Sequence, residues 1–453
     1  MKKITFMNTA MIKVDPMYRG TRKLLQPLDI MYAINTLDHE QYRCRFIEMA
    51  LENLLDEDIS NEDVFIVSTT TSYLQWNNYF LSLRNIDQVL NLLQQKRRDK
   101  NYKLIIFGPH CINHYKYFTD RGVDIVIVGE PESVLSEVVY KSLNNESLND
   151  FENVVTKEKL LQGFIPRTLQ VDMRNIPSPN WEICGSHEYS AHNSPKVFQK
   201  GFLYETSRGC PFQCSYCNTE THRRLYRTKP VEQIKHDLER MVYEHGAEYV
   251  YFIDESFGYD DEWVDRLLPI LKEIPVEWGC QGNIKFTTPE KLLKMAEAGC
   301  ISMEFGLETF NNEILKSVRK SNDLTRVREL IDAALNAGIS PLLFLLIGLP
   351  GETLDSLEKT VDFLGTLKPG FRFSTGIPTP YPNTHYYRQG IEQGIIKPGQ
   401  NDESLYLLSG TINNNLVWDR NQMNIFLNDY GPNIWGTPQN IKRFSVDVFK
   451  MFK

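Results

Sequence analysis

The sequence predicts an α/β protein with two successive regions in which β-strands and helices alternate. Short apolar runs alternate with helically spaced apolar residues over 1–150 and again over 201–390, a pattern that favours parallel sheets with helical crossovers. The run Ile125-Val126-Ile127-Val128 is continuously apolar and β-branched, as in a strand buried on both faces of a parallel sheet. Three cysteines follow the first strand of the second region. We therefore expect a doubly wound, Rossmann-like domain at 1–150 and a partial (β/α)6 barrel at 201–390.

Five strands and three helices are expected in the first region. The strands lie at 3–8, 42–49, 63–69, 103–108 and 124–129. The helices lie at 27–37, 84–96 and 133–143, and the second of them carries Ile86, Val89, Leu90 and Leu93 at helical spacing. In a doubly wound sheet, ligands bind beyond the carboxyl ends of the strands.

Small turns with glycine or hydroxyl residues follow three of these strands. Their residues are Thr69, Thr70, Thr71, Gly108, Pro109, His110, Gly129 and Glu130. Glycines and small hydroxyl groups let a large flat ligand approach the backbone and form hydrogen bonds with it. The pattern alone is equally consistent with ordinary loops, because any α/β domain has polar turns at that edge.

Two segments lack clear periodicity. Residues 151–200 contain Ile176-Pro177-Ser178-Pro179-Asn180-Trp181, which cannot form a regular helix or a central strand, so we expect a linker there. Residues 391–453 are expected to form a C-terminal segment that caps the substrate site over the open end of the barrel. Packing against the edge of the barrel is the alternative for that segment.

Cys210, Cys214 and Cys217 have the spacing C-x3-C-x2-C. Three thiols from one loop can hold an iron–sulfur cubane with one iron left open to a non-protein ligand. A structural zinc site completed by His222 is the competing interpretation. The other five cysteines are scattered without a regular framework of pairs, which favours a reducing compartment.

Six barrel strands are expected at 201–207, 249–254, 276–280, 301–307, 342–349 and 371–377. Thr288 and Pro289 have the residue types of a helix N-cap and first helical position. Several strands end in residues suited to a polar ligand, namely Asp254, Glu255, Glu308, Gly348 and Gly351. Each of these also has a simpler interpretation, as a turn glycine or as a carboxylate at a helix start.

The segment Ser-Arg-Gly-Cys-Pro-Phe-Gln-Cys-Ser-Tyr-Cys-Asn (207–218), followed in order by these strand-end motifs, resembles the radical S-adenosylmethionine (SAM) enzymes. The turns Phe107-Gly108-Pro109-His110 and Val128-Gly129-Glu130-Pro131 resemble those of the cobalamin-binding domain joined to many of them. The chain thus resembles cobalamin-dependent radical SAM enzymes of the methyltransferase type, over most of 1–390.

The resemblance implies a role for each candidate residue. The three cysteines would hold a [4Fe-4S] cluster that binds SAM, and the turns of the first region would contact cobalamin. Around SAM, Tyr216 would lie by the adenine, Asp254 and Glu255 by the amino group, Glu308 by the ribose, and Gly348 and Gly351 by the adenosine. Two positions depart from the family pattern. Gln281-Gly282-Asn283 lies where a basic residue is expected, and Met17 occupies the place of the cobalt-ligating histidine found in other cobalamin proteins.

The implied reaction is methylation of an unactivated carbon through a 5′-deoxyadenosyl radical and methylcobalamin. Cyclisation or rearrangement without methyl transfer is the first alternative. Methylthio transfer is less consistent, because that family has three further cysteines near its N-terminus and only Cys44 and Cys111 precede residue 150 here. A non-enzymatic zinc-binding scaffold is the alternative from another class.

Composition limits the partners. The net charge of −8 argues against nucleic acid, and no apolar run reaches the roughly 18 residues of a membrane span. We therefore expect a cytoplasmic protein that acts on a small molecule or a peptide. The resemblance further implies an electron donor such as flavodoxin or ferredoxin.

Overall fold

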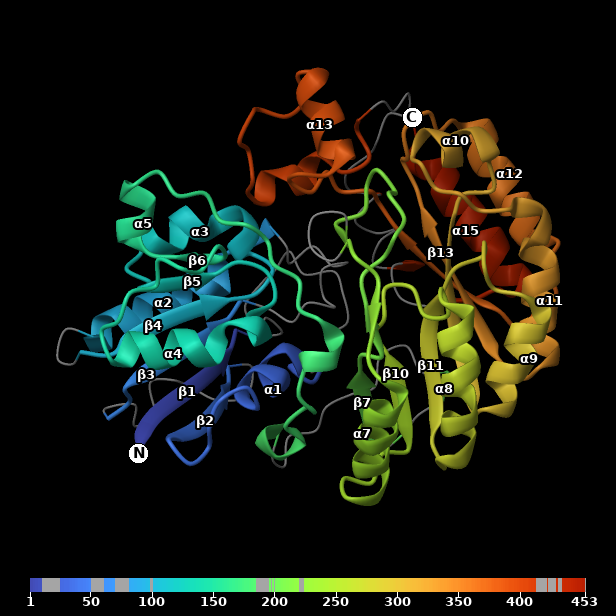
Figure 1. Ribbon diagram of the computed structural model, residues 1–453. Coiled ribbons are helices and arrows are strands. Elements are labelled where there is room, and N and C mark those ends of the chain that lie inside the picture. Colours follow the sequence, from blue (N-terminus) through green and yellow to red (C-terminus); the bar gives the residue numbers. More distant parts are fainter. Residues whose placement is uncertain are drawn as a thin grey trace. The chain divides into compact units, whose positions relative to one another are not determined.

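The structure is a computed structural model (Figure 1). It describes residues 1–9, 25–49, 61–69, 81–97, 101–184, 195–196, 198, 200–219, 224–412, 422, 429–430 and 434–452. The chain divides into two compact units, and the main division falls between Tyr189 and Ser190.

The first unit is built on a six-stranded sheet of order β2-β1-β3-β4-β5-β6. Its strands are β1 (Lys2–Asn8), β2 (Tyr42–Glu48), β3 (Val64–Ser68), β4 (Lys103–Phe107), β5 (Ile125–Ile127) and β6 (Val154–Val155). All neighbours are parallel except β5 and β6. The order reverses at β1 and β3, which is the point where doubly wound sheets bind ligands.

Helices cover both faces of this sheet. They are α1 (Leu28–Ile34), α2 (Arg84–Arg97), α3 (Cys111–Asp120), α4 (Leu135–Leu143) and the short α5 (Lys157–Leu161). Helices α2 and α3 share one apolar core with the sheet, and α1 and α4 share the other. Strand residues alternate accordingly, since Phe65 and Val67 face the first core while Val64 and Ile66 face the second. The doubly wound architecture predicted from the sequence is confirmed.

Two parts of this unit differ from expectation. Helix α3 was not predicted, and its buried residues are few and partly polar (Cys111, His114, Phe118 and Thr119), with a non-helical backbone at His114. Residues 151–184, expected to form a linker, instead complete the first unit. Strand β6 pairs with β5, and the Asn180 N–H donates to the Met31 carbonyl at 3.0 Å.

The second unit contains six parallel strands that are neighbours in chain order. They are β7 (Gly201–Tyr204), β10 (Tyr249–Phe252), β11 (Glu277–Gly282), β12 (Cys300–Glu308), β13 (Ser340–Leu346) and β14 (Arg372–Gly376). The crossover helices are α7 (Val231–Tyr243), α8 (Asp261–Glu273), α9 (Pro289–Glu297), α10 (Asn312–Ser317), α11 (Val327–Asn336) and α12 (Leu354–Gly365). Figure 1 shows α8, α9, α11 and α12 along one side of these strands. Each expected strand is present, and Thr288 caps α9 as predicted.

The described part of 391–453 packs at the edge of this sheet. Strand β15 (Ile434–Trp435) pairs antiparallel with β14, and α15 (Pro438–Met451) packs beside α12. The Phe444 ring lies 5.3 Å from that of Phe373 on β14. These residues therefore follow the edge-packing alternative, whereas residues 413–421 lie outside the described part of the chain.

No helix among the described residues has the length and apolar character needed to cross a bilayer. The longest of them, α2 and α15, have 14 residues each, whereas a transmembrane helix needs about 20.

Candidate functional site

The three cysteines lie in one loop that leaves the carboxyl end of β7. Strands β8 (Ser207–Arg208) and β9 (Arg227–Thr228) pair antiparallel at the base of this loop. Between the second and third cysteines the chain turns, and the Cys217 N–H donates to the Cys214 carbonyl at 3.0 Å. Ser215 fixes the middle of the loop, because its N–H donates to the Val318 carbonyl and its own carbonyl accepts the Tyr386 N–H. All three thiols are free and partly buried.

The three thiols influence one another electrostatically. The pKa of Cys210 is raised to about 11 and that of Cys217 to about 12, mainly by burial, and the charge of Cys214 contributes to both shifts. The pKa of Cys214 is also raised, mainly by burial. The thiols are therefore protonated near neutral pH, and metal binding would release their protons.

Lys320 supplies a positive charge beside these thiols. Its Nζ lies 2.9 Å from Glu308 Oε1, with the two side chains 13% and 8% exposed. Burial lowers the pKa of Lys320, but Glu308, Cys214 and Cys217 together raise it by more. Gly306 leaves room for this pair, since a Cβ there would lie 2.4 Å from Glu308 Oε1 and 2.7 Å from Lys320 Nζ. Lys320 was not predicted from the sequence, whereas a basic residue was expected near Gln281, whose Nε2 donates to Glu304 at 3.3 Å.

Glu308 has a left-handed backbone, with φ of +66°. Non-glycine residues rarely adopt this region and often do so at functional sites. The turn brings the Glu308 carboxylate, which the sequence predicted to contact ribose, next to Lys320 and Tyr216. Burial raises the pKa of Tyr216 well above its ordinary value, and the Glu308 charge raises it further.

Tyr216 joins the cysteine loop to two strand ends. It packs against the apolar cluster formed by Ile314 and Val318 after β12 and Leu349 after β13. The structure thus brings together Tyr216, Glu308 and the turn that contains Gly348, three features that the sequence assigned to one ligand.

Asp254 and Glu255 follow β10 and bind the base of the cysteine loop. The Asp254 carboxylate accepts hydrogen bonds from Thr206 N (2.8 Å), Thr206 Oγ1 (2.5 Å) and Ser207 Oγ (2.6 Å), and the residue is fully buried. Burial raises the pKa of Asp254 to about 7, although these bonds lower it. Glu255 accepts the Gly209 N–H at 2.8 Å. In this structure both carboxylates anchor the loop, and their contact with the SAM amino group stays a prediction.

The turn after β13 is shaped by two glycines and one buried carboxylate. Gly348 and Gly351 have φ values of +90° and +83°, and a Cβ on Gly351 would meet nothing within 4 Å. The Gly348 N–H donates to Glu352 Oε2 at 2.5 Å. Burial raises the pKa of Glu352 to about 8, and the bonds from Gly348 and Leu349 lower it.

Glu352→Gln is expected to make the unfolding free energy less dependent on pH. Because the folded pKa of about 8 lies above the ordinary 4.5, the folded protein holds an extra proton between these values. Wild-type stability therefore falls as pH rises through this window, by at most about 1.4 kcal/mol per pH unit. In denaturant titrations, the unfolding free energy of Glu352→Gln relative to the wild type should be larger at pH 8 than at pH 5. The exposed Glu358→Gln should show no such difference between the two pH values. An unchanged difference at the two pH values would contradict the assignment.

At the carboxyl edge of the first sheet, hydroxyl groups and a glycine pack closely. Thr69 is fully buried and its N–H donates to the Phe107 carbonyl at 2.9 Å. A Cβ on Gly108 (φ +115°) would lie 2.4 Å from Thr69 Oγ1. Pro109 and His110 lead into α3, and His110 is 1% exposed. Thr70, Thr71 and Met17 lie outside the described residues, as does His222 of the zinc alternative.

Gly129 and Glu130 contact another part of the same unit. A Cβ on Gly129 would lie 2.5 Å from the Leu169 carbonyl oxygen, and Glu130 Oε2 accepts the Val171 N–H at 2.6 Å. The sequence predicted an open turn for a cofactor here. Leu169 and Val171, which lie in the segment predicted as a linker, pack against this turn, and its contact with a cofactor stays a prediction.

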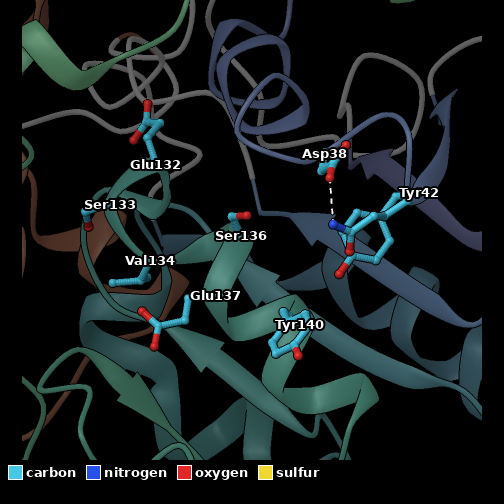
Figure 2. Close-up of a pocket in the computed structure, with 9 residues that line it drawn as sticks. Asp38, Tyr42, Glu132, Ser133, Val134, Ser136, Glu137 and Tyr140 are labelled. Atoms are coloured by element: carbon cyan, nitrogen blue, oxygen red, sulfur yellow. Dashed lines mark hydrogen bonds between the residues drawn. The ribbon is translucent and has the colours of Figure 1, made fainter.

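A cavity of about 350 Å³ lies in the first unit (Figure 2). Glu137 and Tyr140 of α4 line one side, and Asp38 and Tyr42 line the other. Because Tyr42 is the first residue of β2, the cavity extends along α4 to the amino end of the sheet. None of its lining residues was assigned to a cofactor from the sequence, although Glu132, Ser133 and Val134 follow closely after Glu130.

Residues 204–364 match the family model described as the Radical SAM superfamily. This span of the chain is therefore a radical SAM domain. This radical SAM protein is 26% identical over 386 residues to an uncharacterized methyltransferase of Pyrococcus horikoshii, an alignment that covers 82% of this chain and 79% of the relative. It is 28% identical over 268 residues to the cytidylyl-2-hydroxyethylphosphonate methyltransferase of Streptomyces wedmorensis, covering 55% of this chain but only 49% of the relative.

Two solved structures share the fold of this radical SAM protein. One is the radical SAM methyltransferase TsrM from Kitasatospora setae with tryptophan and a SAM analogue, with a TM-score of 0.65, 12% identity, and coverage of 86% of this chain and 77% of TsrM. TsrM has also been solved with cobalamin and a [4Fe-4S] cluster. The other is the cobalamin-dependent S-adenosylmethionine radical enzyme OxsB with aqua-cobalamin bound. It has a TM-score of 0.66 and 17% identity, and the match covers 88% of this chain and 57% of OxsB. At these identities the likeness establishes the fold alone, which this chain shares with TsrM and OxsB.

Proposed function

We propose that this radical SAM enzyme methylates an unactivated carbon of a small molecule or peptide, with cobalamin as the methyl carrier. The observation that supports it most is the convergence of three free thiols with the Lys320–Glu308 pair at the carboxyl ends of a parallel sheet. The doubly wound unit that precedes this sheet and the methyltransferase relatives point to the same class of reaction.

Cys210, Cys214 and Cys217 fit a [4Fe-4S] cluster. They supply three thiolates from one loop, one fewer than a closed four-cysteine site. When bound, the cluster would supply the electron that cleaves SAM and cobalamin would carry the methyl group, while the protein provides binding and orientation. A flavodoxin or ferredoxin is proposed as the electron donor.

Tyr216, Glu308 and Lys320 fit SAM. The Tyr216 ring, packed by Leu349, can lie against the adenine, and the Glu308 carboxylate can accept from ribose hydroxyls. The Lys320 ammonium has three N–H donors, of which Glu308 takes one. We assign the remaining N–H donors of Lys320 to the SAM carboxylate. Gly348 and Gly351 allow the adenosine to approach their turn.

The β1/β3 switch point of the first unit fits cobalamin. Thr69 follows β3 and Gly108 follows the neighbouring β4 at the carboxyl edge of the sheet, and Thr69 Oγ1 is buried without a hydrogen-bond partner among the described residues. A large cofactor with many amide groups can use such hydroxyl and backbone groups. Among the first-unit residues singled out in the sequence, Thr69, Thr70, Thr71, Gly108, Pro109 and His110 are kept in this role.

Anaerobic reconstitution with iron, sulfide and cobalamin tests the proposed function. The absorption spectrum should show iron–sulfur and corrinoid bands, and SAM with a deuterated methyl group should yield a labelled product in extracts of cells that express the protein. A rearranged product without label would replace methylation by the alternative reaction. A colourless protein that binds zinc would exclude both.

A further inference from the structure

A buried network of charged and polar side chains lies beneath the loop that carries the three cysteines. The chain enters this loop from β7 through β8 and returns from it through β9. The side chains of the network come from both ends of the loop and from α7 and the end of β10, and none is more than 1% exposed: Tyr204, Glu205, Thr206, Ser207, Arg208, Lys229, Asp237 and Asp254.

Lys229 is fixed where the chain leaves the loop. Its Nζ donates to the Tyr204 hydroxyl at 3.2 Å and lies 3.7 Å from Asp237 Oδ2, and the Tyr204 hydroxyl donates to the same Asp237 oxygen at 2.6 Å. Its backbone N–H donates to the Thr206 carbonyl at 2.9 Å. Its carbonyl accepts from Trp263 Nε1 at 3.1 Å. Contacts from β7, α7 and α8 thus determine the position of one residue.

The entry to the loop is fixed in the same way. Asp254 binds Thr206 and Ser207 through three hydrogen bonds. The Arg208 guanidinium lies 2.8 Å from the Glu205 carboxylate, and both side chains are 1% exposed. Both ends of the loop at 209–226 are therefore held to the sheet independently of the cysteines.

Stability alone does not account for these charges. A buried ion pair contributes little more than well-packed apolar side chains, because the loss of hydration offsets the attraction. Burial lowers the pKa of Lys229 to about 8, although Asp237 raises it. The ribbon at the base of the loop pairs only two residues in each strand, and so short a ribbon is marginal by itself. The side-chain network therefore holds the two ends of the loop in place, which the short pairing of β8 and β9 cannot do alone.

We propose, on the assignment of the cysteines to a cluster made above, that Lys229 and Asp237 are positioning residues that hold the cysteine loop in its cluster-binding conformation before iron is bound. Ligands held in place by buried neighbours retain metals better, and loss of such neighbours lowers metal affinity by about 10–100-fold. The pair therefore determines how well the cluster is retained rather than how it reacts.

The neutral pair Lys229→Met with Asp237→Asn tests this role, because it removes both charges and keeps a side-chain oxygen for Tyr204. We expect an unfolding temperature near that of the wild type and an iron content after reconstitution below half of the wild-type content. Iron release to a chelator should be at least about fivefold faster than in the wild type. The matched control is Lys235→Met with Glu273→Gln, an exposed pair that also starts on α7, and it should release iron at the wild-type rate. A folded double variant that also releases iron at that rate would overturn the positioning role.

Hydrogen exchange in the cluster-free wild-type protein gives a second measurement that needs no variant. Peptides that cover 204–208 and 227–230 should exchange more slowly than the turn at 211–217, and equal exchange would also overturn the inference. A variant with alanine at Cys210, Cys214 and Cys217 separates the two hypotheses. If it retains iron, the cluster assignment fails. If it loses iron while the neutral pair behaves as the wild type, only the role of Lys229 and Asp237 fails.

Discussion

Replacement of Cys210, Cys214 or Cys217 by alanine is expected to abolish SAM cleavage. Each variant removes one of three ligands to the proposed cluster, and no other cysteine of the described residues lies in this loop to replace it. Loss of a ligand should exceed the roughly 10–100-fold effect typical of neighbours that only orient a ligand. Formation of 5′-deoxyadenosine, measured under reducing conditions with SAM, should fall to background together with the visible absorption of the cluster.

Cys44→Ala is the matched control for these variants. Cys44 lies on β2 in the first unit, is also half-buried, and has a pKa that burial raises to about 11, as it does for Cys210. Its replacement should leave iron content and SAM cleavage unchanged. Continued formation of 5′-deoxyadenosine in any of the three loop variants would remove the radical SAM assignment of this loop.

The longer strands of the two main sheets could be predicted, most directly where a short apolar run has a distinct boundary. Strand β5 lies within the run Ile125–Val128, and β13 (Ser340–Leu346) overlaps the predicted strand at 342–349. Helix α3 was not predictable, because its buried face includes His114 and Thr119, and such residues give no apolar period. The two-residue strand β6 is also too short for a period of two.

The site could be predicted only where local motifs carry it. The cysteine spacing, Glu308 and the glycines of the β13 turn have recognisable sequence neighbours, and the structure brings Tyr216, Glu308 and Leu349 together. Partnerships between distant residues leave no local pattern. Lys320 lies 12 residues from Glu308, and Asp254 binds Thr206 across 48 residues. The sequence therefore indicated which strand ends carry the candidate residues but not which protein groups pair with these carboxylates.

Lys320→Met is expected to weaken SAM binding by about 10–100-fold, because a hydrogen bond to a charged group contributes about 1.5–3 kcal/mol. The same change leaves the Glu308 carboxylate without its cation at 8% exposure, which costs about 3–5 kcal/mol of stability unless the carboxyl group takes up a proton. Equilibrium dialysis of SAM with the reconstituted variant measures the first effect, and denaturant unfolding measures the second.

Two further variants distinguish SAM contact from support of Glu308. Lys320→Met with Glu308→Gln removes both charges, so the unfolding free energy should recover while SAM binding stays weak. Lys316→Met breaks an exposed ion pair on α10 with Glu313 and should change neither quantity. Because Glu308 is itself assigned to the ribose, wild-type SAM affinity in the double variant would show that neither Lys320 nor Glu308 contacts SAM. Because Lys320 is also within electrostatic reach of the cysteines, iron content must be measured in every variant before its SAM affinity is compared.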